Sequence, residues 1–387
     1  MIPYGRQDIT EKDVEAVVKV LHSDFLTQGE AVPTFEKNLC DYTGAKYAVS
    51  VNSCTSALHI ACLALGLAPG DILWTSPITF VASANCALYC GASVDFVDIE
   101  PDTGLMSAKK LEDKLKLAEK EGKIPKIVIP VHFSGQPCDM KEIYNLSQQY
   151  GFNIIEDAAH AIGSTYQGDI VGNCQYSDIT VFSFHPVKII TTGEGGAAMT
   201  NNSLLAEKMD LLRSHGITRD LDKIQKNPDG PWYYEQMELG YNYRMTDIQA
   251  ALGSSQISRL DQYILRRTEI VRQYNNYFEN ISVNPLLQKP DRISAHHLYV
   301  IRVEGDEKMR RELYDYLHEN SISVNVHYIP VNKQIFHKKY SKNNTPIADF
   351  LYKKIISLPL FFRLTDEEVA FICSQVGKGS FDLKREV

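Results

Sequence analysis

The sequence predicts an α/β fold, with a large domain built on a mostly parallel central sheet and a smaller C-terminal α+β domain. Short β-branched runs alternate with helical patterns from about residue 45 to residue 200, and most are separated by enough chain for a crossover helix. After residue 245 the pattern changes to a long amphipathic helix and then to further strand and helix patterns. We therefore expect two domains, residues 1–245 and 246–387.

The amino-terminal region predicts a helix over residues 13–21 and an approach loop, SDFLTQGE, that could cover a site. The strands expected next are short and rich in β-branched residues. They are KYAVSV (46–51), DILWTS (71–76), SVDFVDI (93–99), KIVIPVHF (126–133), NIIED (153–157), DITVFSF (178–184) and GAAMT (196–200). Ligands of such sheets gather at the carboxyl ends of the strands, so the site is expected there.

The second half begins with a polar segment, residues 218–232, whose turn residues predict a surface excursion. The apolar periodicity of residues 238–280 predicts one extended helix that leaves the large domain. A strand over 297–303, a helix over 307–319, a strand over 322–328 and closing helices then predict the smaller domain.

Composition excludes several classes of protein. With 48 acidic and 40 basic residues the net charge is −8, so a nucleic-acid partner is not expected. The amino terminus is too polar for a signal peptide, and no stretch approaches the roughly 20 apolar residues that span a bilayer. The eight cysteines are scattered, which favours reduced core thiols in a cytoplasmic protein. His296 and His297 lack acidic or thiol companions, so no metal site is expected.

Lys188 is a lone amine after an apolar strand, in the stretch DITVFSFHPVKIITTGEGG. Burial disfavours an ammonium and lowers its pKa, which turns a lysine into a nucleophile near neutral pH. The alternative is a surface lysine on a loop, because most lysines are exposed.

Asp157 ends the strand NIIED, and His160 follows three residues later. A carboxylate at that end of a sheet can hold a proton on a pyridine nitrogen. The alternative is a helix cap, since AAHAIG could begin a helical turn.

The stretch VNSCTSALHIACLALGL predicts a strand that enters a helix near Thr55 and Ser56. Free amides, hydroxyls and the positive end of a helix can bind a phosphate there, although a simple helix cap gives the same sequence. No Gly-x-Gly-x-x-Gly follows the first strand and no P-loop motif occurs, so neither nicotinamide cofactors nor nucleotide hydrolysis is supported. A phosphate cradle, an aspartate and a lysine at successive strand ends are the parts that a pyridoxal 5′-phosphate (PLP) enzyme needs.

Several motifs together resemble the DegT/DnrJ/EryC1/StrS family of sugar aminotransferases, which are fold type I PLP enzymes. They are NSCTSALHIA, SPITFVASANCALYCGA, EDAAHAIGSTYQG, FSFHPVKIITTGEGGA, RSHGI and LGYNYRMTDIQAALG. The resemblance covers essentially the whole chain. It implies amino transfer in two half-reactions, with pyridoxamine 5′-phosphate (PMP) as the intermediate cofactor form. The family's dehydrating members carry histidine in place of the lysine that is present here as Lys188, so the resemblance favours amino transfer.

The resemblance also assigns roles to residues around the cofactor. Lys188 would bond covalently to the cofactor aldehyde and carry protons, and Asp157 would pair with the pyridine nitrogen. The other expected cofactor contacts are Phe80 on the ring, His160 near the phenolic oxygen, and Thr55, Ser56 and Ser183 on the phosphate. Asn242 would reach the cofactor phosphate of a neighbouring subunit, which implies a homodimer with shared sites. Without the resemblance, Phe80 would be interpreted as a core residue and Asn242 as a turn residue.

The implied substrates are a UDP-linked 4-keto-6-deoxy-N-acetyl-hexosamine, aminated at C4, and glutamate as amino donor. The residues expected around the sugar nucleotide are Tyr4, Asp24, Phe25, Leu26, Thr27, Cys54, Ser183, Asn242, His327, Tyr328, Ile329 and Pro330. Arg219 and Arg244 are candidates for the donor carboxylate or the nucleotide phosphates. Two alternatives stay open, an aminotransferase acting at C3 or C4 of another nucleotide-linked keto sugar and a PLP-binding regulatory protein without turnover.

Overall fold

A computed structural model describes residues 1–279, 281, 283–340 and 344–385. Its centre is a seven-stranded sheet in the order β1-β9-β8-β5-β4-β2-β3. The strands are β1 (Tyr47–Val51), β2 (Ile72–Thr75), β3 (Ser93–Phe96), β4 (Ile127–Ile129), β5 (Asn153–Asp157), β8 (Ile179–Ser183) and β9 (Gly196–Thr200). All seven strands predicted from the large domain are confirmed, and β9 runs antiparallel to both its neighbours, β1 and β8.

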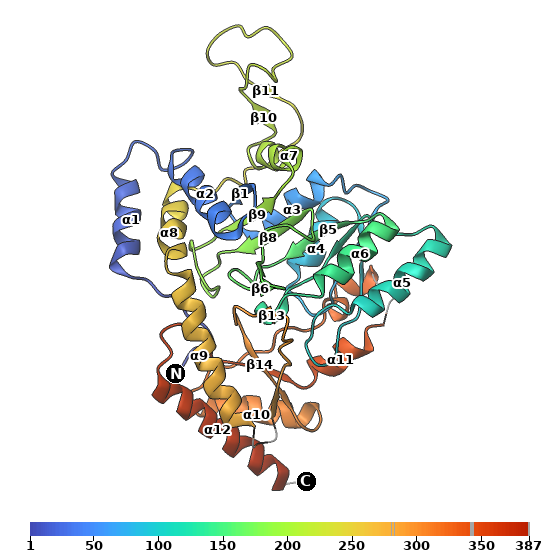
Figure 1. Cartoon of the computed structure of the whole chain (residues 1–387), viewed down its shortest axis with the longest axis vertical. Helices are drawn as coiled ribbons and strands as arrows, with labels where there is room; N and C mark the ends of the chain where they lie inside the picture. The colour runs from blue at the N-terminus through green and yellow to red at the C-terminus, as the bar shows by residue number, and fades with distance from the viewer. Residues whose placement is uncertain (280, 282, 341–343, 386–387) are drawn as a thin grey trace.

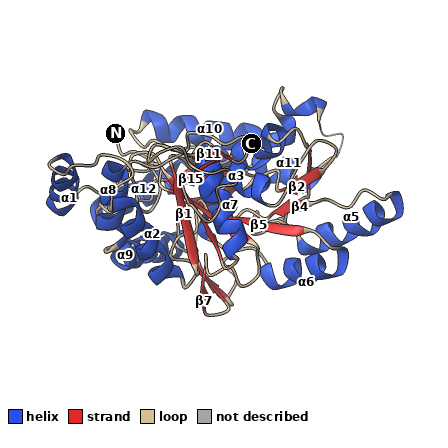
Figure 2. Ribbon diagram, turned by 90° about the horizontal axis from the view of Figure 1, so that it is seen from above, coloured by secondary structure: helices blue, strands red, loops and turns tan. Residues whose placement is uncertain are grey.

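Helices cover both faces of this sheet (Figures 1 and 2). They are α2 (Ala31–Thr43), α3 (Cys54–Ala64), α4 (Ala82–Tyr89), α5 (Ala108–Glu121), α6 (Met140–Tyr150) and α7 (Ser203–Arg213). Every residue of β8 and β9 is buried, as a central strand packed on both faces requires. The sheet is therefore a rigid support for the residues at its strand ends.

Smaller pieces complete the large domain. β6 (Thr165–Tyr166), β7 (Asp169–Ile170) and β13 (Arg292–Ile293) form a short sheet, and η1 (Phe133–Gly135) is a 3-10 turn. β10 (Ile217–Thr218) pairs with β11 (Glu235–Gln236), and the loop between them projects from the top of the molecule in Figure 1. The predicted surface excursion over 218–232 is confirmed.

The single extended helix predicted over residues 238–280 was wrong. The structure has two helices, α8 (Asp247–Ile257) and α9 (Leu260–Phe278), because Arg259 leaves the helical conformation with φ −115° and ψ 7°. The Arg259 guanidinium donates to both carboxylate oxygens of Asp13 on α1 (Glu11–Leu21), at 2.9 and 2.7 Å. The break lets α8 pack on α1 and α2 while α9 continues toward the carboxyl-terminal part (Figure 1). The domain boundary at residue 246 stays a prediction.

The carboxyl-terminal part has an antiparallel sheet in the order β12-β14-β15, formed by β12 (Val283–Pro285), β14 (Tyr299–Val303) and β15 (Ile355–Leu358). The predicted helix over 307–319 is confirmed as α10 (Glu307–Glu319). The other helical segments are η2 (Val331–Lys333), η3 (His337–Lys339), α11 (Pro346–Tyr352) and α12 (Asp366–Arg385). Among the described residues, no helix is long and apolar enough to span a membrane.

The strand predicted over 322–328 was also wrong. This segment makes only isolated bridges, from Ile322 to Ile2 and from Asn325 to Ser357. It passes from the amino-terminal segment to β15, and its last residues then turn into a cavity at the end of the central sheet. Because its backbone partners change along its length, it forms no continuous ladder.

Candidate active site

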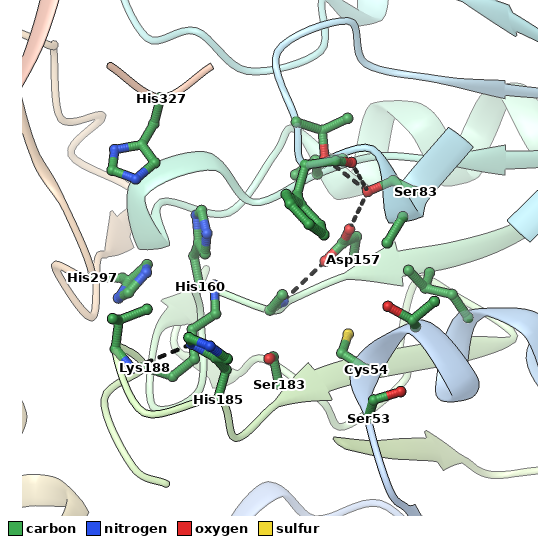
Figure 3. Close-up of a pocket in the computed structure, with 18 of the residues that line it drawn as sticks. Ser53, Cys54, Ser83, Asp157, His160, Ser183, His185, Lys188, His297 and His327 are labelled. Carbon is green, nitrogen blue, oxygen red and sulfur yellow. Dashed lines mark hydrogen bonds between the residues drawn. The ribbon is translucent and has the colours of Figure 1, made fainter. Parts of the chain in front are cut away.

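A cavity of about 1040 Å³ opens at the carboxyl ends of β5 and β8, beside the first turn of α3 (Figure 3). Its wall is completed by the loop before α4 and by the segment 325–328. Among the residues singled out from sequence, the lining includes Tyr4, Cys54, Thr55, Ser56, Phe80, Asp157, His160, Ser183, Lys188, His327 and Tyr328. Residues from six separate regions of the chain therefore meet at one place.

Lys188 follows β8 in a turn that its backbone N–H closes by donating to the His185 carbonyl, at 2.8 Å. The side chain is half-buried and lines the cavity. Burial lowers the pKa of Lys188 to about 8, against the attraction of Cys54 and Asp157. In the described part of the chain its ammonium has no hydrogen-bond or ion-pair partner, so near neutral pH it can both accept and donate a proton.

Asp157 is the last residue of β5 and is 5% exposed. Its Oδ2 accepts a hydrogen bond from the Ser83 hydroxyl at 2.6 Å, and its Oδ1 accepts one from the Ala159 N–H at 3.1 Å. The helix-cap alternative fails, because residues 158–163 form turns and no helix begins there. The carboxylate is therefore fixed in a tight loop and faces the cavity.

A group of buried histidines and a tyrosine forms the wall near Lys188 (Figure 3). His160 Nε2 lies 3.1 Å from the Tyr328 hydroxyl, and the His160 and His297 ring centroids are 4.3 Å apart. Burial, with the nearby Lys188 charge, holds the pKa values of His160 and His297 well below the ordinary range. His327 is similar, with a pKa of about 4, so these imidazoles are neutral at pH 7.

The opposite end of the cavity is the amino terminus of α3. Ser53 is its N-cap and accepts from the Ser56 N–H at 3.1 Å, and the helix begins at Cys54, which confirms the predicted start near Thr55 and Ser56. The Ser56 hydroxyl donates to Asn52 Oδ1 at 2.7 Å. Within the described residues, the hydroxyls of Thr55 and Ser183 have no partner, and both line the cavity.

Gly196 allows the sheet to approach this helix terminus. It pairs with Val51 on one side and Ser183 on the other, between β1 and β8. A Cβ atom at Gly196 would lie 2.5 Å from the Cys54 nitrogen and 2.6 Å from the Ser53 carbonyl carbon. The glycine therefore keeps the first amides of α3 close to Ser183, and these donors together suit a phosphate group.

These features fit PLP. The cavity has an amine of lowered pKa, a fixed carboxylate, a phosphate-sized set of donors, and a buried His160 Nδ1 that lacks a partner among the described residues. Phe80 lines the same cavity and is 60% exposed, so its ring is open to a flat ligand. The fold and the site define a PLP-dependent aminotransferase.

Residues 7–377 match the DegT/DnrJ/EryC1/StrS aminotransferase family, and the chain belongs to that family. The UDP-4-amino-4,6-dideoxy-N-acetyl-beta-L-altrosamine transaminase of Campylobacter jejuni subsp. jejuni serotype O:23/36 (strain 81-176) is 40% identical over 375 residues, which cover 96% of each chain. The structure of Helicobacter pylori PseC, an aminotransferase involved in the biosynthesis of pseudoaminic acid, superposes with a TM-score of 0.90 at 32% identity, covering 98% of this chain and 99% of that one.

Spr1654 from Streptococcus pneumoniae, solved in a PMP form, gives a TM-score of 0.90 at 32% identity and covers 99% of this chain and 100% of that one. The same protein is also known in a PLP form. The chain is therefore a PLP-dependent sugar aminotransferase, and the alternative of a regulatory protein without turnover is set aside.

Other predicted residues do not reach the cavity of their own chain. These are Asp24, Phe25, Leu26, Thr27, Asn242, Ile329 and Pro330. The DFLT loop lies at the surface, where the Leu26 carbonyl accepts from the Asp247 N–H at 3.0 Å. The Asn242 carbonyl accepts from the Asn52 side chain, and Ile329 is 46% exposed. The backbone positions of these residues therefore place them outside the cavity of their own chain.

The two candidate arginines also lie outside the cavity. Arg219 packs over the Tyr234 ring on the projecting hairpin, and Arg244 bridges to Val51 through its backbone. Lys188 is the one lysine or arginine among the described residues that line the cavity. Neither arginine of the same chain therefore reaches a carboxylate bound beside Lys188.

Sequence reasoning missed several lining residues, including Asn52, Ser53, Thr79, Ser83, Gln249, His297 and Asn325. One signal was present, since Ser53 directly follows a strand and precedes a helix, as an N-cap does. Thr79 and Ser83 carried no such signal, because their position depends on how the loop before α4 and the first turn of α4 lie relative to Asp157.

Proposed function

We propose that this enzyme transfers an amino group from glutamate to C4 of a UDP-linked 4-keto-6-deoxy-N-acetyl-hexosamine and so gives a UDP-4-amino sugar for glycans of the pseudaminic acid type. The observation that carries the proposal is the 40% identity to the Campylobacter jejuni transaminase over 96% of both chains. The cavity supports it, because its volume of about 1040 Å³ leaves space for a sugar beside the cofactor.

PLP, when bound, supplies an aldehyde and an electron-withdrawing ring that stabilises negative charge on the carbon undergoing proton transfer. The chain holds it through the α3 amides and the Thr55 and Ser183 hydroxyls at the phosphate, with Phe80 against the ring. Asp157 holds the proton on the ring nitrogen. Lys188 Nζ moves protons, a task that suits a pKa of about 8.

The sugar is expected beside a wall of aromatic and histidine side chains. Tyr4, His327 and Tyr328 lie together, with the Tyr4 and His327 ring centroids 5.6 Å apart. Burial raises the pKa of Tyr328 and lowers that of His327, so both side chains are neutral hydrogen-bonding groups at pH 7. Such groups suit the hydroxyl and keto oxygens of a sugar.

The residues outside the cavity of their own chain support a homodimer with shared sites. Asn242 and the loop Asp24–Thr27 would complete the partner's cavity, and Arg219 or Arg244 would hold the donor carboxylate or the nucleotide phosphates there. This arrangement would supply the cations that the described lining lacks apart from Lys188.

The test is incubation of the holoenzyme with glutamate and a panel of UDP-linked 3-keto and 4-keto sugars, with products identified by mass and NMR. We expect an amine at C4 of the 4-keto-6-deoxy-N-acetyl sugar, and no product with Lys188→Ala. Amination at C3, or turnover only of another sugar in the panel, would replace the proposed substrate while leaving the class of enzyme unchanged.

A further inference from the structure

The Asp157 carboxylate accepts a hydrogen bond from the side chain of Ser83, a residue to which the sequence analysis gave no role. The Ser83 hydroxyl lies 2.6 Å from Asp157 Oδ2 and 2.7 Å from the Thr79 hydroxyl, and all three side chains are at most 5% exposed. We propose that Ser83 is a positioning residue that keeps the Asp157 carboxylate turned toward the cofactor's ring nitrogen. The proposal rests on the role of Asp157 proposed above.

The direction of these hydrogen bonds follows from counting protons. A serine hydroxyl has one hydrogen, and an ionised carboxylate can only accept. The Phe80 carbonyl is a competing acceptor for Ser83 at 3.3 Å, but the carboxylate is closer and charged. Ser83 therefore donates to Asp157, and Thr79 must donate to Ser83. The chain Thr79 to Ser83 to Asp157 polarises the Ser83 hydroxyl and strengthens its bond to the carboxylate.

The bond from Ser83 acts on the proton that Asp157 and the ring nitrogen share. A hydrogen bond donated to a carboxylate favours its ionised form. The proton then stays on the ring nitrogen, where it makes the ring a stronger electron acceptor. With the Ala159 N–H on Oδ1 and Ser83 on Oδ2, the carboxylate is also fixed in rotation.

The same short segment carries the residue expected to stack on the ring. Phe80 lies between Thr79, in the loop before α4, and Ser83, in the first turn of α4, and its carbonyl accepts from the Ser83 N–H at 3.3 Å. The loop and this first helical turn therefore fix both the ring face and, through Ser83, the partner of the ring nitrogen.

The test compares two cofactors on the apoenzyme, PLP and an analogue in which CH replaces the ring nitrogen. Both carry the same aldehyde and phosphate, so the ratio of their dissociation constants isolates the contact at the ring nitrogen. We expect a large preference for PLP in the wild-type protein and a ratio near one in Asp157→Asn. In Ser83→Ala the preference should fall by about tenfold, the factor that corresponds to one lost hydrogen bond to a charged group.

Matched variants separate positioning from packing, because a packing defect weakens both cofactors and leaves the ratio unchanged. Ser83→Thr keeps the hydroxyl and should retain the preference. Thr75→Val removes another buried hydroxyl, which bonds to the Ile129 carbonyl at 2.9 Å, and should leave the ratio at the wild-type value. Thr79→Val should lower the ratio less than Ser83→Ala does, and it serves as the test if Ser83→Ala does not fold.

The outcomes distinguish the two claims. If the preference for PLP is lost in Asp157→Asn but unchanged in Ser83→Ala and Thr79→Val, the proposed role of Ser83 is overturned. A ratio that Asp157→Asn leaves unchanged, or one near unity in the wild-type protein, would overturn the role of Asp157 and the role of Ser83 with it.

Discussion

At the scale of single residues, Lys188 illustrates how burial prepares a common side chain for chemistry. Desolvation lowers its pKa to about 8, although Cys54 and Asp157 attract the charged form. An ammonium that is partly removed from water and has no counter-ion at hydrogen-bonding distance is costly, so a larger share of the amine is neutral near pH 8, and the neutral amine is the nucleophilic form. The free-energy cost of desolvating the Lys188 ammonium therefore contributes to the nucleophilicity of the amine.

This pKa predicts how the apoenzyme captures PLP as pH changes. The neutral amine attacks the aldehyde, so the capture rate should rise about tenfold per pH unit below pH 8 and level off above it. The measurement is stopped-flow absorbance of apoenzyme mixed with PLP between pH 6.5 and 9, with Lys188→Ala as the control for noncovalent binding. A rate that still climbs toward the ordinary lysine value of 10.5 would show that the amine is not desolvated.

The residues that sequence reasoning found and missed differ in one physical respect. Asp157 ends the buried strand β5 and Lys188 lies in the turn after the buried strand β8, so these strands bring both ionisable groups to the edge of the sheet. Thr79 is an ordinary hydroxyl residue in the loop before α4, and Ser83 is one in the first turn of α4. Their relation to Asp157 depends on tertiary packing, which local patterns do not encode.

At the scale of elements, the junction of β9 with α3 positions the phosphate donors. Gly196→Ala would place a methyl group 2.5 Å from the Cys54 nitrogen, so the strand and the helix would have to separate. We expect a loss of about 1–3 kcal/mol in the free energy of unfolding. We also expect weaker PLP binding, because the donors move apart.

Urea denaturation of the apoenzyme and titration with PLP measure the two effects. Gly5→Ala is the matched control, since its Cβ would meet the nearest atom, Val187 Cβ, at an ordinary 3.7 Å. Unchanged stability and unchanged affinity in Gly196→Ala would mean that the junction does not need the close approach.

Sequence periodicity predicted some of the helices and strands correctly and failed for others. The seven strands of the central sheet were predicted because short apolar, β-branched runs flanked by turns are typical of buried strands. The break between α8 and α9 was missed because the residues around Arg259 keep a helical pattern, while its bonds to Asp13 come from a distant segment. The short β12 was missed as well, since three residues carry too little pattern.

At the scale of the whole molecule, the proposed homodimer explains why some predicted residues lie outside their own cavity. If Asn242 serves the partner's site, then Lys188→Ala and Asn242→Ala subunits should complement each other when mixed. Each mixed dimer would have one intact site, so random exchange should restore about a quarter of wild-type turnover.

The complementation experiment needs two controls, separate proof of subunit exchange and strong impairment by Asn242→Ala alone. With both in place, the absence of recovered turnover would mean that Lys188 and Asn242 serve one site from one chain. The proposed arrangement would depend on a surface between two subunits, which local sequence patterns do not encode.

The central claim is that Lys188 is the residue that bonds to PLP, and borohydride reduction of the holoenzyme tests it most directly. Reduction fixes the cofactor on the amine that carries it, and peptide mapping by mass spectrometry then locates the added group. We expect a single pyridoxyl label on Lys188, within the stretch HPVKIITTGEGG, and no label in Lys188→Ala. A label on any other lysine, or a holoenzyme that gains none, would contradict the site described above.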